Sequence, residues 1–163
     1  MKVAVLSDVH DHIWNLEVLL SQIRDAGLLI FCGDFCAPFT LDMIGEGFPG
    51  PVYATLGNND GDVLLLTRVA GKHPNVTLVA PFGEVEADGQ RLAFVHYPQF
   101  GEGLAALGRY DAVFAGHSHV GEVRTIGRTL FANPGEVMGR LGEPSYGLYD
   151  TETRAFTTRH IER

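Results

Sequence analysis

The sequence predicts an α/β fold in which two mixed β-sheets pack face to face with helices on the outside. In the first half, short apolar runs alternate with longer amphipathic segments, an order that implies parallel strands joined by right-handed crossovers. In the second half, short strand-like runs succeed one another, and turn signals separate them. Two sheets with outer helices account for all of these elements.

The first half begins with an apolar run over 3–6 that Ser7 ends, which predicts a buried strand. Helically spaced apolar residues from Ile13 predict a helix that reaches Arg24 and stops near Gly27. The same reasoning predicts strands over 28–32 and 52–56, helices over 40–44 and 63–70, and a turn-rich stretch over 45–51.

The second half contains sequence signals for β-hairpins. Asp88-Gly89 and Gly127-Arg128 are turn signals between apolar runs. The runs predict strands over 76–79, 83–87, 91–95, 112–115, 122–126, 129–132, 146–150 and 155–160, with one short helix over 102–107.

Length and composition limit the function. The 163 residues fit one domain over 1–163, and the net charge of −8 disfavours binding to long nucleic acid, which needs many Lys and Arg contacts. No stretch approaches the roughly 20 apolar residues that cross a bilayer. The apolar start is too short for an export signal, and Cys32 and Cys36 are expected to be reduced packing residues. A cytoplasmic protein without a membrane partner is therefore expected.

Polar side chains of metal-ligating type come directly after five predicted strands, at the point where each strand ends. They are Asp8 and His10, then Asp34, Asn58, His96, and finally His117 and His119. Ligand sites gather beyond the carboxyl ends of parallel strands, so these side chains are expected to meet. Each motif alone is typical of an ordinary turn, but their recurrence predicts a metal site. Oxygen and nitrogen ligands without thiolate suit Mn²⁺, Fe, Zn²⁺, Co²⁺ or Ni²⁺.

Together these motifs resemble the calcineurin-like metallophosphoesterase superfamily. The resemblance rests on Asp8-x-His10, Gly33-Asp34, Gly57-Asn58-x-Asp60, His96 and Gly116-His-x-His119, and it extends from Val3 to about Tyr149. The short chain and Asn133-Pro134-Gly135 are similar to its small bacterial and archaeal phosphodiesterase branch.

The resemblance implies a four-layer α/β/β/α sandwich with two divalent metal ions, Mn²⁺ being the first choice. Matched by motif, one ion would be bound by Asp8, His10 and His119. The other would be bound by Asn58, His96 and His117, and Asp34 would bridge both.

Such a centre suits the hydrolysis of a small phosphodiester. Two ions about 3.5–4 Å apart stabilise the attacking and leaving oxygens and supply a bridging hydroxide near neutral pH. Two divalent ions, two aspartates and one hydroxide leave a net positive centre, which attracts a small anion in this acidic protein. The sequence therefore predicts a metal-dependent phosphodiesterase acting on a small phosphate ester.

Four further residues are candidates for the site. Asn59 and His12 are expected, with Asp34, to be catalytic, whereas Asp60 and Asn133 are expected to support the ligands. Asn59 stands where the family often has a histidine; its amide donates a hydrogen bond but no proton, so His12 is a candidate substitute proton donor. Asp60 is expected to cap the following helix or to hold a ligand histidine, and Asn133 to shape the site. Glu136, where relatives often have serine, receives no role.

Two other functions remain open at this stage. A phosphomonoesterase or pyrophosphatase would use the same metals. A non-catalytic scaffold, like the retromer subunit that shares this fold, would be expected to lack metal ligands, whereas all seven matched positions are filled here. Exposed apolar residues such as Trp14 or Phe39 could form the face of a homo-oligomer.

Overall fold

The computed structural model describes residues 1–162. Its helices and strands alternate in the first half, whereas strands dominate the second. In chain order they are β1 (Lys2–Leu6), α1 (Ile13–Gln22), β2 (Leu28–Phe31), α2 (Pro38–Gly47), β3 (Val52–Thr55), α3 (Val63–Ala70), β4 (Val76–Val79), β5 (Phe82–Ala87), β6 (Gln90–Val95), α4 (Pro98–Ala106), β7 (Ala112–Phe114), β8 (Glu122–Ile126), β9 (Thr129–Asn133), β10 (Ser145–Asp150) and β11 (Ala155–His160).

The strands form two mixed sheets, as the sequence predicts. The first sheet has the order β11-β10-β1-β2-β3-β4, in which β1 to β4 are parallel and β10 and β11 are antiparallel to their neighbours. The second sheet has the order β5-β6-β7-β9-β8, in which β6, β7 and β9 are parallel. The carboxyl ends of β1, β2 and β3 thus meet at one edge, and those of β6 and β7 meet likewise.

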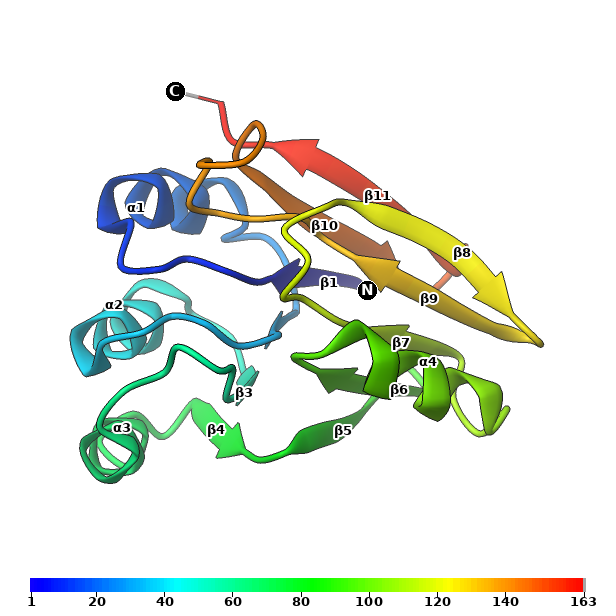
Figure 1. The fold of residues 1–163 in the computed structure, drawn as a ribbon, viewed down its shortest axis with the longest axis horizontal. Helices are drawn as coiled ribbons and strands as arrows, with labels where there is room; N and C mark the ends of the chain where they lie inside the picture. Colours follow the sequence, from blue (N-terminus) through cyan, green and yellow to red (C-terminus); the bar gives the residue numbers. More distant parts are fainter. Residues whose placement is uncertain (163) are drawn as a thin grey trace.

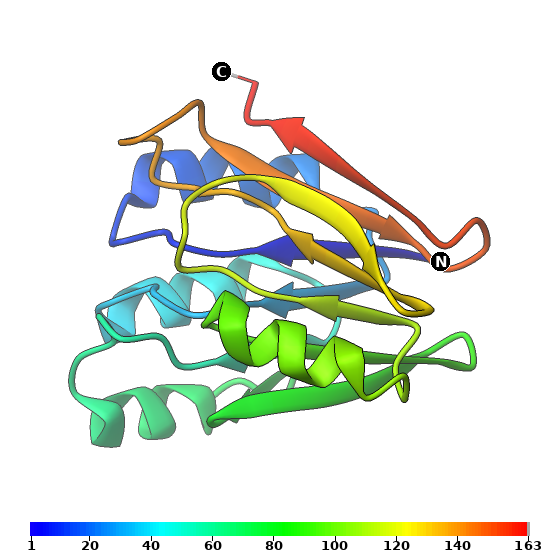
Figure 2. The same ribbon diagram turned by 45° about the vertical axis from the view of Figure 1, so that its right-hand side comes forward.

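Three apolar layers join four layers of secondary structure. In β1, Ala4 and Leu6 pack with α1, α2 and α3, whereas Val3 and Val5 pack between the two sheets. A third cluster joins the second sheet to α4 through residues such as Phe131. Figures 1 and 2 show α1, α2 and α3 along one side of the sheets and α4 on the other. The alternation of side chains along each strand therefore produces the four-layer sandwich.

Two helices are longer than the sequence predicts. The stretch over 45–51 is predicted to be turn-rich, but α2 continues to Gly47, and α4 begins at Pro98 rather than at 102. Both helices begin with proline, whose fixed φ suits the first turn. The glycines serve close packing: a Cβ on Gly45 would lie 2.5 Å from the His73 ring, and one on Gly101 would lie 2.8 Å from Phe131.

Within residues 1–162, the helices are all too short or too polar to cross a lipid bilayer. Cys32 is buried, Cys36 is partly exposed, and both are free thiols.

Candidate metal centre

The seven side chains expected to bind metal lie together in the loops after β1, β2, β3, β6 and β7. Most of these loop residues have left-handed backbone conformations. The residues with positive φ are Asp8 (55°), His10 (45°), Asp34 (62°), His117 (66°) and His119 (62°). Asp and His tolerate this region better than most residues, and strained backbone of this kind clusters at functional sites. Hydrogen bonds from the Asp8 amide to Gly33 O (3.1 Å) and from the His10 amide to Asp34 O (3.0 Å) hold two of the loops together.

The first group of ligand atoms surrounds the carboxylate of Asp8. Oδ1 of Asp8, which is fully buried, lies 3.7 Å from His10 Nε2 and 3.5 Å from His119 Nε2. One ligand atom from each of these three residues falls within 4.8 Å of the others. Oδ2 of Asp8 accepts a hydrogen bond of 3.0 Å from the His117 backbone amide. The Asp8 carboxylate is therefore fixed with one oxygen facing two imidazoles.

The second group surrounds Nε2 of His96. This atom lies 2.9 Å from Asn58 Oδ1, 3.2 Å from His117 Nδ1 and 3.4 Å from Asp34 Oδ2. Asp34 Oδ2 is also 3.6 Å from His10 Nε2, so the Asp34 carboxylate lies between the two groups. Ligand atoms of Asp8, Asp34 and His96 also fall within 4.8 Å of one another.

Asp34 is held as a charged carboxylate. Burial alone would raise its pKa, but hydrogen bonds involving His96 and Asn59 hold the pKa of Asp34 well below its usual range. Asn59 donates to this carboxylate twice, through its backbone amide (2.8 Å) and through Nδ2 (2.7 Å). The side chain of Asn59, expected to serve the leaving group, is thus engaged with Asp34 here.

The negative charge of the site also acts on its histidines. The nearby carboxylates of Asp8 and Asp34 raise the pKa of His10. Burial would lower the pKa of His96, but its contact with Asp34 outweighs burial and raises the pKa above its ordinary value. An environment that stabilises an imidazolium cation also favours a metal cation.

The Nδ1 atoms of three histidines are occupied by partners outside the ligand set. His96 Nδ1 lies 2.8 Å from Cys32 O, and His119 Nδ1 lies 2.6 Å from Glu136 Oε2. His10 Nδ1 lies 3.5 Å from Cys36 Sγ. Such bonds fix the orientation of each ring and leave Nε2 to face the site.

Asp60 does not act as the sequence suggested. Asp62, and not Asp60, caps α3, because its side chain accepts the Leu65 amide hydrogen at 3.0 Å. Asp60 contacts no ligand histidine; its carboxylate accepts the backbone amides of Asp34 (3.1 Å), Cys36 (2.8 Å) and Gly57 (2.6 Å). It therefore holds the Asp34 turn against the turn after β3.

Asn133 supports a loop of the site, whereas His12 caps a helix. Asn133 Nδ2 donates to Gly116 O (2.8 Å) and Ser118 Oγ (3.0 Å), and thereby braces the loop that carries His117 and His119. His12 is the N-cap of α1, and its Nδ1 accepts the Asn15 amide hydrogen at 3.3 Å.

Glu136 is the residue that sequence reasoning missed. Its carboxylate is buried, contacts His119 and accepts two backbone amides from its own loop. Nothing about a glutamate in a loop indicates burial, because glutamate is usually exposed. The signal that could have placed it near the site is its position directly after Asn133-Pro134-Gly135, just beyond β9, which pairs with β7.

The donor set fits divalent metal ions. Within residues 1–162, Asp8 Oδ1 and His10 Nε2 are buried and have no hydrogen-bond partner, although both face the same point. A buried polar atom without a partner is costly, so such atoms indicate an ion or water that they are built to contact. Carboxylate and imidazole without thiolate are ligands for metals such as Mn²⁺, Fe and Zn²⁺.

Comparison with known proteins identifies the family. Residues 1–154 match the model of the calcineurin-like phosphoesterase superfamily domain. The chain belongs to the calcineurin-like phosphoesterase superfamily. It is 31% identical over 161 residues to a phosphodiesterase of Methanocaldococcus jannaschii, with 96% of each chain covered.

Two solved structures share the fold of this chain. An archaeal phosphodiesterase superimposes with a TM-score of 0.89 at 30% identity, covering 99% of this chain and 100% of that one. Vacuolar protein sorting 29 from Cryptosporidium parvum superimposes with a TM-score of 0.68 at 17% identity, covering 97% and 95%. The second likeness concerns the fold alone.

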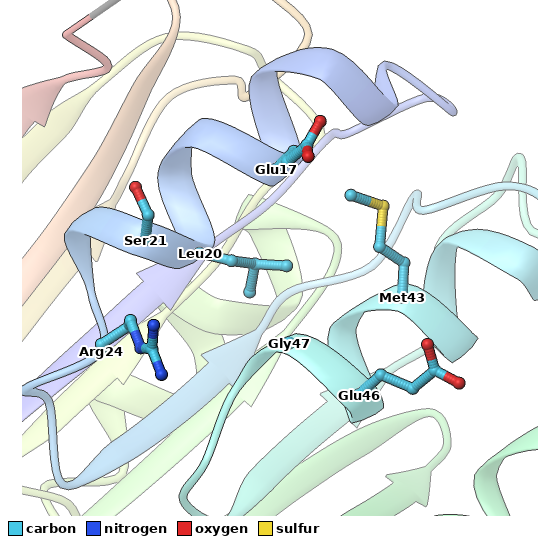
Figure 3. Close-up of a pocket in the computed structure, with 7 residues that line it drawn as sticks. All are labelled: Glu17, Leu20, Ser21, Arg24, Met43, Glu46 and Gly47. Carbon is cyan, nitrogen blue, oxygen red and sulfur yellow. The ribbon is translucent and has the colours of Figure 1, made fainter.

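A separate cleft of about 410 Å³ lies between α1 and α2 (Figure 3). It is lined by Glu17, Leu20, Ser21, Arg24, Met43, Glu46 and Gly47, which come from the two helices and, for Arg24, from the turn just after α1. None of the seven candidate ligands lines it, so the cleft is distinct from the candidate metal centre.

Gly57 provides a first test of the site geometry. A Cβ at this position would lie 2.1 Å from Asp34 Oδ1 and 2.6 Å from the Asp34 backbone nitrogen. We expect Gly57→Ala to displace the Asp34 turn, to cost about 1–3 kcal/mol of unfolding free energy and to lower activity more than tenfold. Thermal unfolding and initial rates measure both. Gly61→Ala is the matched control, because a Cβ at Gly61 meets nothing within 4 Å; equal behaviour of the two variants would contradict the prediction.

Proposed function

We propose that this phosphoesterase hydrolyses small phosphodiesters with the help of two divalent metal ions, Mn²⁺ being the first choice, in the cytoplasm. The observation that carries the proposal is the convergence of two buried carboxylates, four imidazoles and one amide oxygen from five loops, with Asp34 between the two groups. The similarity to a phosphodiesterase over nearly the whole chain supports the same reaction class.

Each side chain would have a defined task. Asp8, His10 and His119 would hold one ion, Asn58, His96 and His117 the other, and Asp34 both. When bound, the two ions supply a nucleophilic water near neutral pH and stabilise charge on the phosphate oxygens. Asn59 keeps Asp34 charged and correctly turned. The carbonyl of Cys32 keeps the proton of His96 on Nδ1, so that Nε2 is free to bind metal.

The leaving group would receive its proton from outside the ligand set. Asn59 cannot supply one. His12 is the candidate: its Nδ1 accepts a hydrogen bond from Asn15, so a neutral ring carries its proton on Nε2. A proton donor of this kind contributes about 10²–10⁴-fold to the rate.

Leaving-group dependence tests this arrangement. Asn59 cannot donate a proton and His12 uses its Nδ1 to cap α1, so we expect a site without a strong proton donor. Rates on aryl diesters should then fall steeply as the leaving-group pKa rises, and alkyl esters should react about 10²–10⁴-fold more slowly. Initial rates on a series of substituted bis-aryl phosphates measure the slope, and His12→Asn is the companion variant. A flat slope in the wild type would contradict a site without a proton donor; a flat wild type with a steep variant would assign the donor to His12.

The preference for diesters over monoesters is tested separately. We propose a small phosphodiester as substrate and not long nucleic acid, because the protein carries a net charge of −8. Because the chain is similar to a phosphodiesterase, we expect bis-aryl phosphate to turn over faster than mono-aryl phosphate at the same metal concentration. The reverse order would indicate a phosphomonoesterase using the same residues.

A homo-oligomer through Trp14 and Phe39, which are 68% and 56% exposed, is a further proposal that sedimentation can test.

A further inference from the structure

The side chain of Glu136 is buried, and both of its carboxylate oxygens have protein partners. It is 1% exposed, and every bond of its carboxylate is made inside the protein. Oε2 lies 2.6 Å from His119 Nδ1, while Oε1 accepts the backbone amides of Leu141 and Gly142, the latter at 2.8 Å. Both carboxylate oxygens of Glu136 thus face nitrogen atoms, two backbone amides at Oε1 and the His119 ring at Oε2, an arrangement that suits a deprotonated carboxylate.

The backbone around Glu136 is attached to the same loop that carries Asp8. The Val137 amide donates to Ser7 O and the Met138 amide donates to Asp8 O, both at 3.1 Å. Glu136 O accepts the Ser145 amide hydrogen at 2.8 Å. The carboxylate is therefore placed at a fixed position relative to Asp8, whose Oδ1 faces the other side of the His119 ring at 3.5 Å.

A carboxylate at this position decides which nitrogen of His119 carries the proton. A deprotonated carboxylate only accepts hydrogen bonds, so the neutral ring must present Nδ1–H to it. The lone pair then lies on Nε2, which points towards Asp8 Oδ1 and the point where His10 Nε2 also faces. A histidine without such a partner has nothing to hold its proton on Nδ1. The bond to Glu136 therefore selects the Nδ1–H tautomer.

We propose that Glu136 is a positioning residue that locks His119 in the Nδ1–H tautomer and thereby keeps Nε2 available to a divalent metal ion. The proposal rests on the proposed function in one respect, namely that His119 binds a metal.

The isosteric amide separates this role from mere packing. In Glu136→Gln the side-chain oxygen can still accept the Leu141 and Gly142 amides, but then its NH₂ group faces His119. To accept a hydrogen bond from this NH₂ group, the neutral ring must present a lone pair on Nδ1. Its proton then lies on Nε2, the proposed metal-binding atom. Turning the amide around would instead set its NH₂ against two backbone N–H groups. A residue that only filled space would tolerate glutamine, whereas a residue that fixes the tautomer would not.

The experiment uses purified metal-free protein and has two readouts besides activity. Calorimetric titration with Mn²⁺ measures metal affinity, and long-range ¹H–¹⁵N NMR of the metal-free protein reports the tautomer of His119. We expect Glu136→Gln to weaken one ion by about 10–100-fold and to leave the other unchanged. We expect His119 to change from the Nδ1–H to the Nε2–H form. Glu136→Asp should retain the Nδ1–H tautomer with intermediate affinity, and it serves if the glutamine variant does not fold.

Controls separate this inference from the proposed function. Glu143→Gln makes the same chemical change in the same loop at a side chain that is 81% exposed, and His119→Ala removes the ligand itself. If Glu136→Gln binds Mn²⁺ like Glu143→Gln while His119→Ala loses an ion, the role of Glu136 is refuted and the metal centre stands. If the wild type binds no divalent ion, the proposed function itself fails.

Discussion

Asp34→Asn is expected to lower the hydrolysis of a bis-aryl phosphate by roughly 10³-fold at saturating Mn²⁺. Asp34 Oδ2 lies 3.4 Å from His96 Nε2 and 3.6 Å from His10 Nε2, so its carboxylate lies between the two candidate ligand groups. Asparagine removes its charge. In addition, the Asn59 Nδ2 donor, 2.7 Å away, would face either an amide NH₂ group or a weaker acceptor.

Initial rates at several Mn²⁺ concentrations measure the effect and show whether extra metal restores activity. Asp25→Asn, an identical change at an exposed position after α1, is the matched control and should behave like the wild type. A D34N enzyme with activity within tenfold of the wild type would exclude Asp34 as the shared ligand.

Removal of divalent metal is expected to abolish activity and to destabilise the fold. At free metal concentrations of 100–1,000 times Kd, each bound ion stabilises the native state by about 2.7–4.1 kcal/mol. For a chain of this length we therefore expect chelation to lower Tm by about 5–15 °C per ion. The physical reason is that Asp8 Oδ1 and His10 Nε2 are buried and find no hydrogen-bond partner among residues 1–162.

Calorimetric unfolding with and without a chelator, and then after return of Mn²⁺, measures this effect. Full recovery of Tm and activity distinguishes metal loss from irreversible damage. The D34N variant should show a smaller metal-dependent shift, because it lacks the shared carboxylate. Unchanged hydrolysis after rigorous chelation would contradict the metal-dependent mechanism.

Much of the fold could be predicted because its signals are local. Buried strands such as β2 are continuous apolar runs, and Asp88-Gly89 and Gly127-Arg128 do form the two expected hairpin turns. The candidate ligands could be named before the structure because each lies just beyond the end of a strand, and parallel strands bring their carboxyl ends to one edge.

Errors arose where packing overrides local propensity. Gly45 belongs to the stretch predicted to be turn-rich, and Gly101 lies just before the predicted helix start at 102. Both lie within helices, where the missing Cβ leaves room for the side chains of His73 and Phe131. Asp60 was expected to cap a helix, but its carboxylate accepts the backbone amides of Asp34 and Cys36 in the loop after β2. These two residues are 26 and 24 positions away from Asp60 in the sequence. Contacts of this separation leave no local pattern in a single sequence.

The sequence by itself determined the two-sheet α/β architecture and the identity of the seven candidate ligands, since both depend on hydrophobic period and on the residue types at the end of each strand. Only the tertiary structure decided how these ligands are oriented. The partners of His96, His119 and Asp34 are the carbonyl of Cys32 just beyond β2, Glu136 and Asn59, and they are selected by distance across the fold. Hydrogen bonds act over about 3 Å, so which atom faces which is fixed only when the loops are packed against one another.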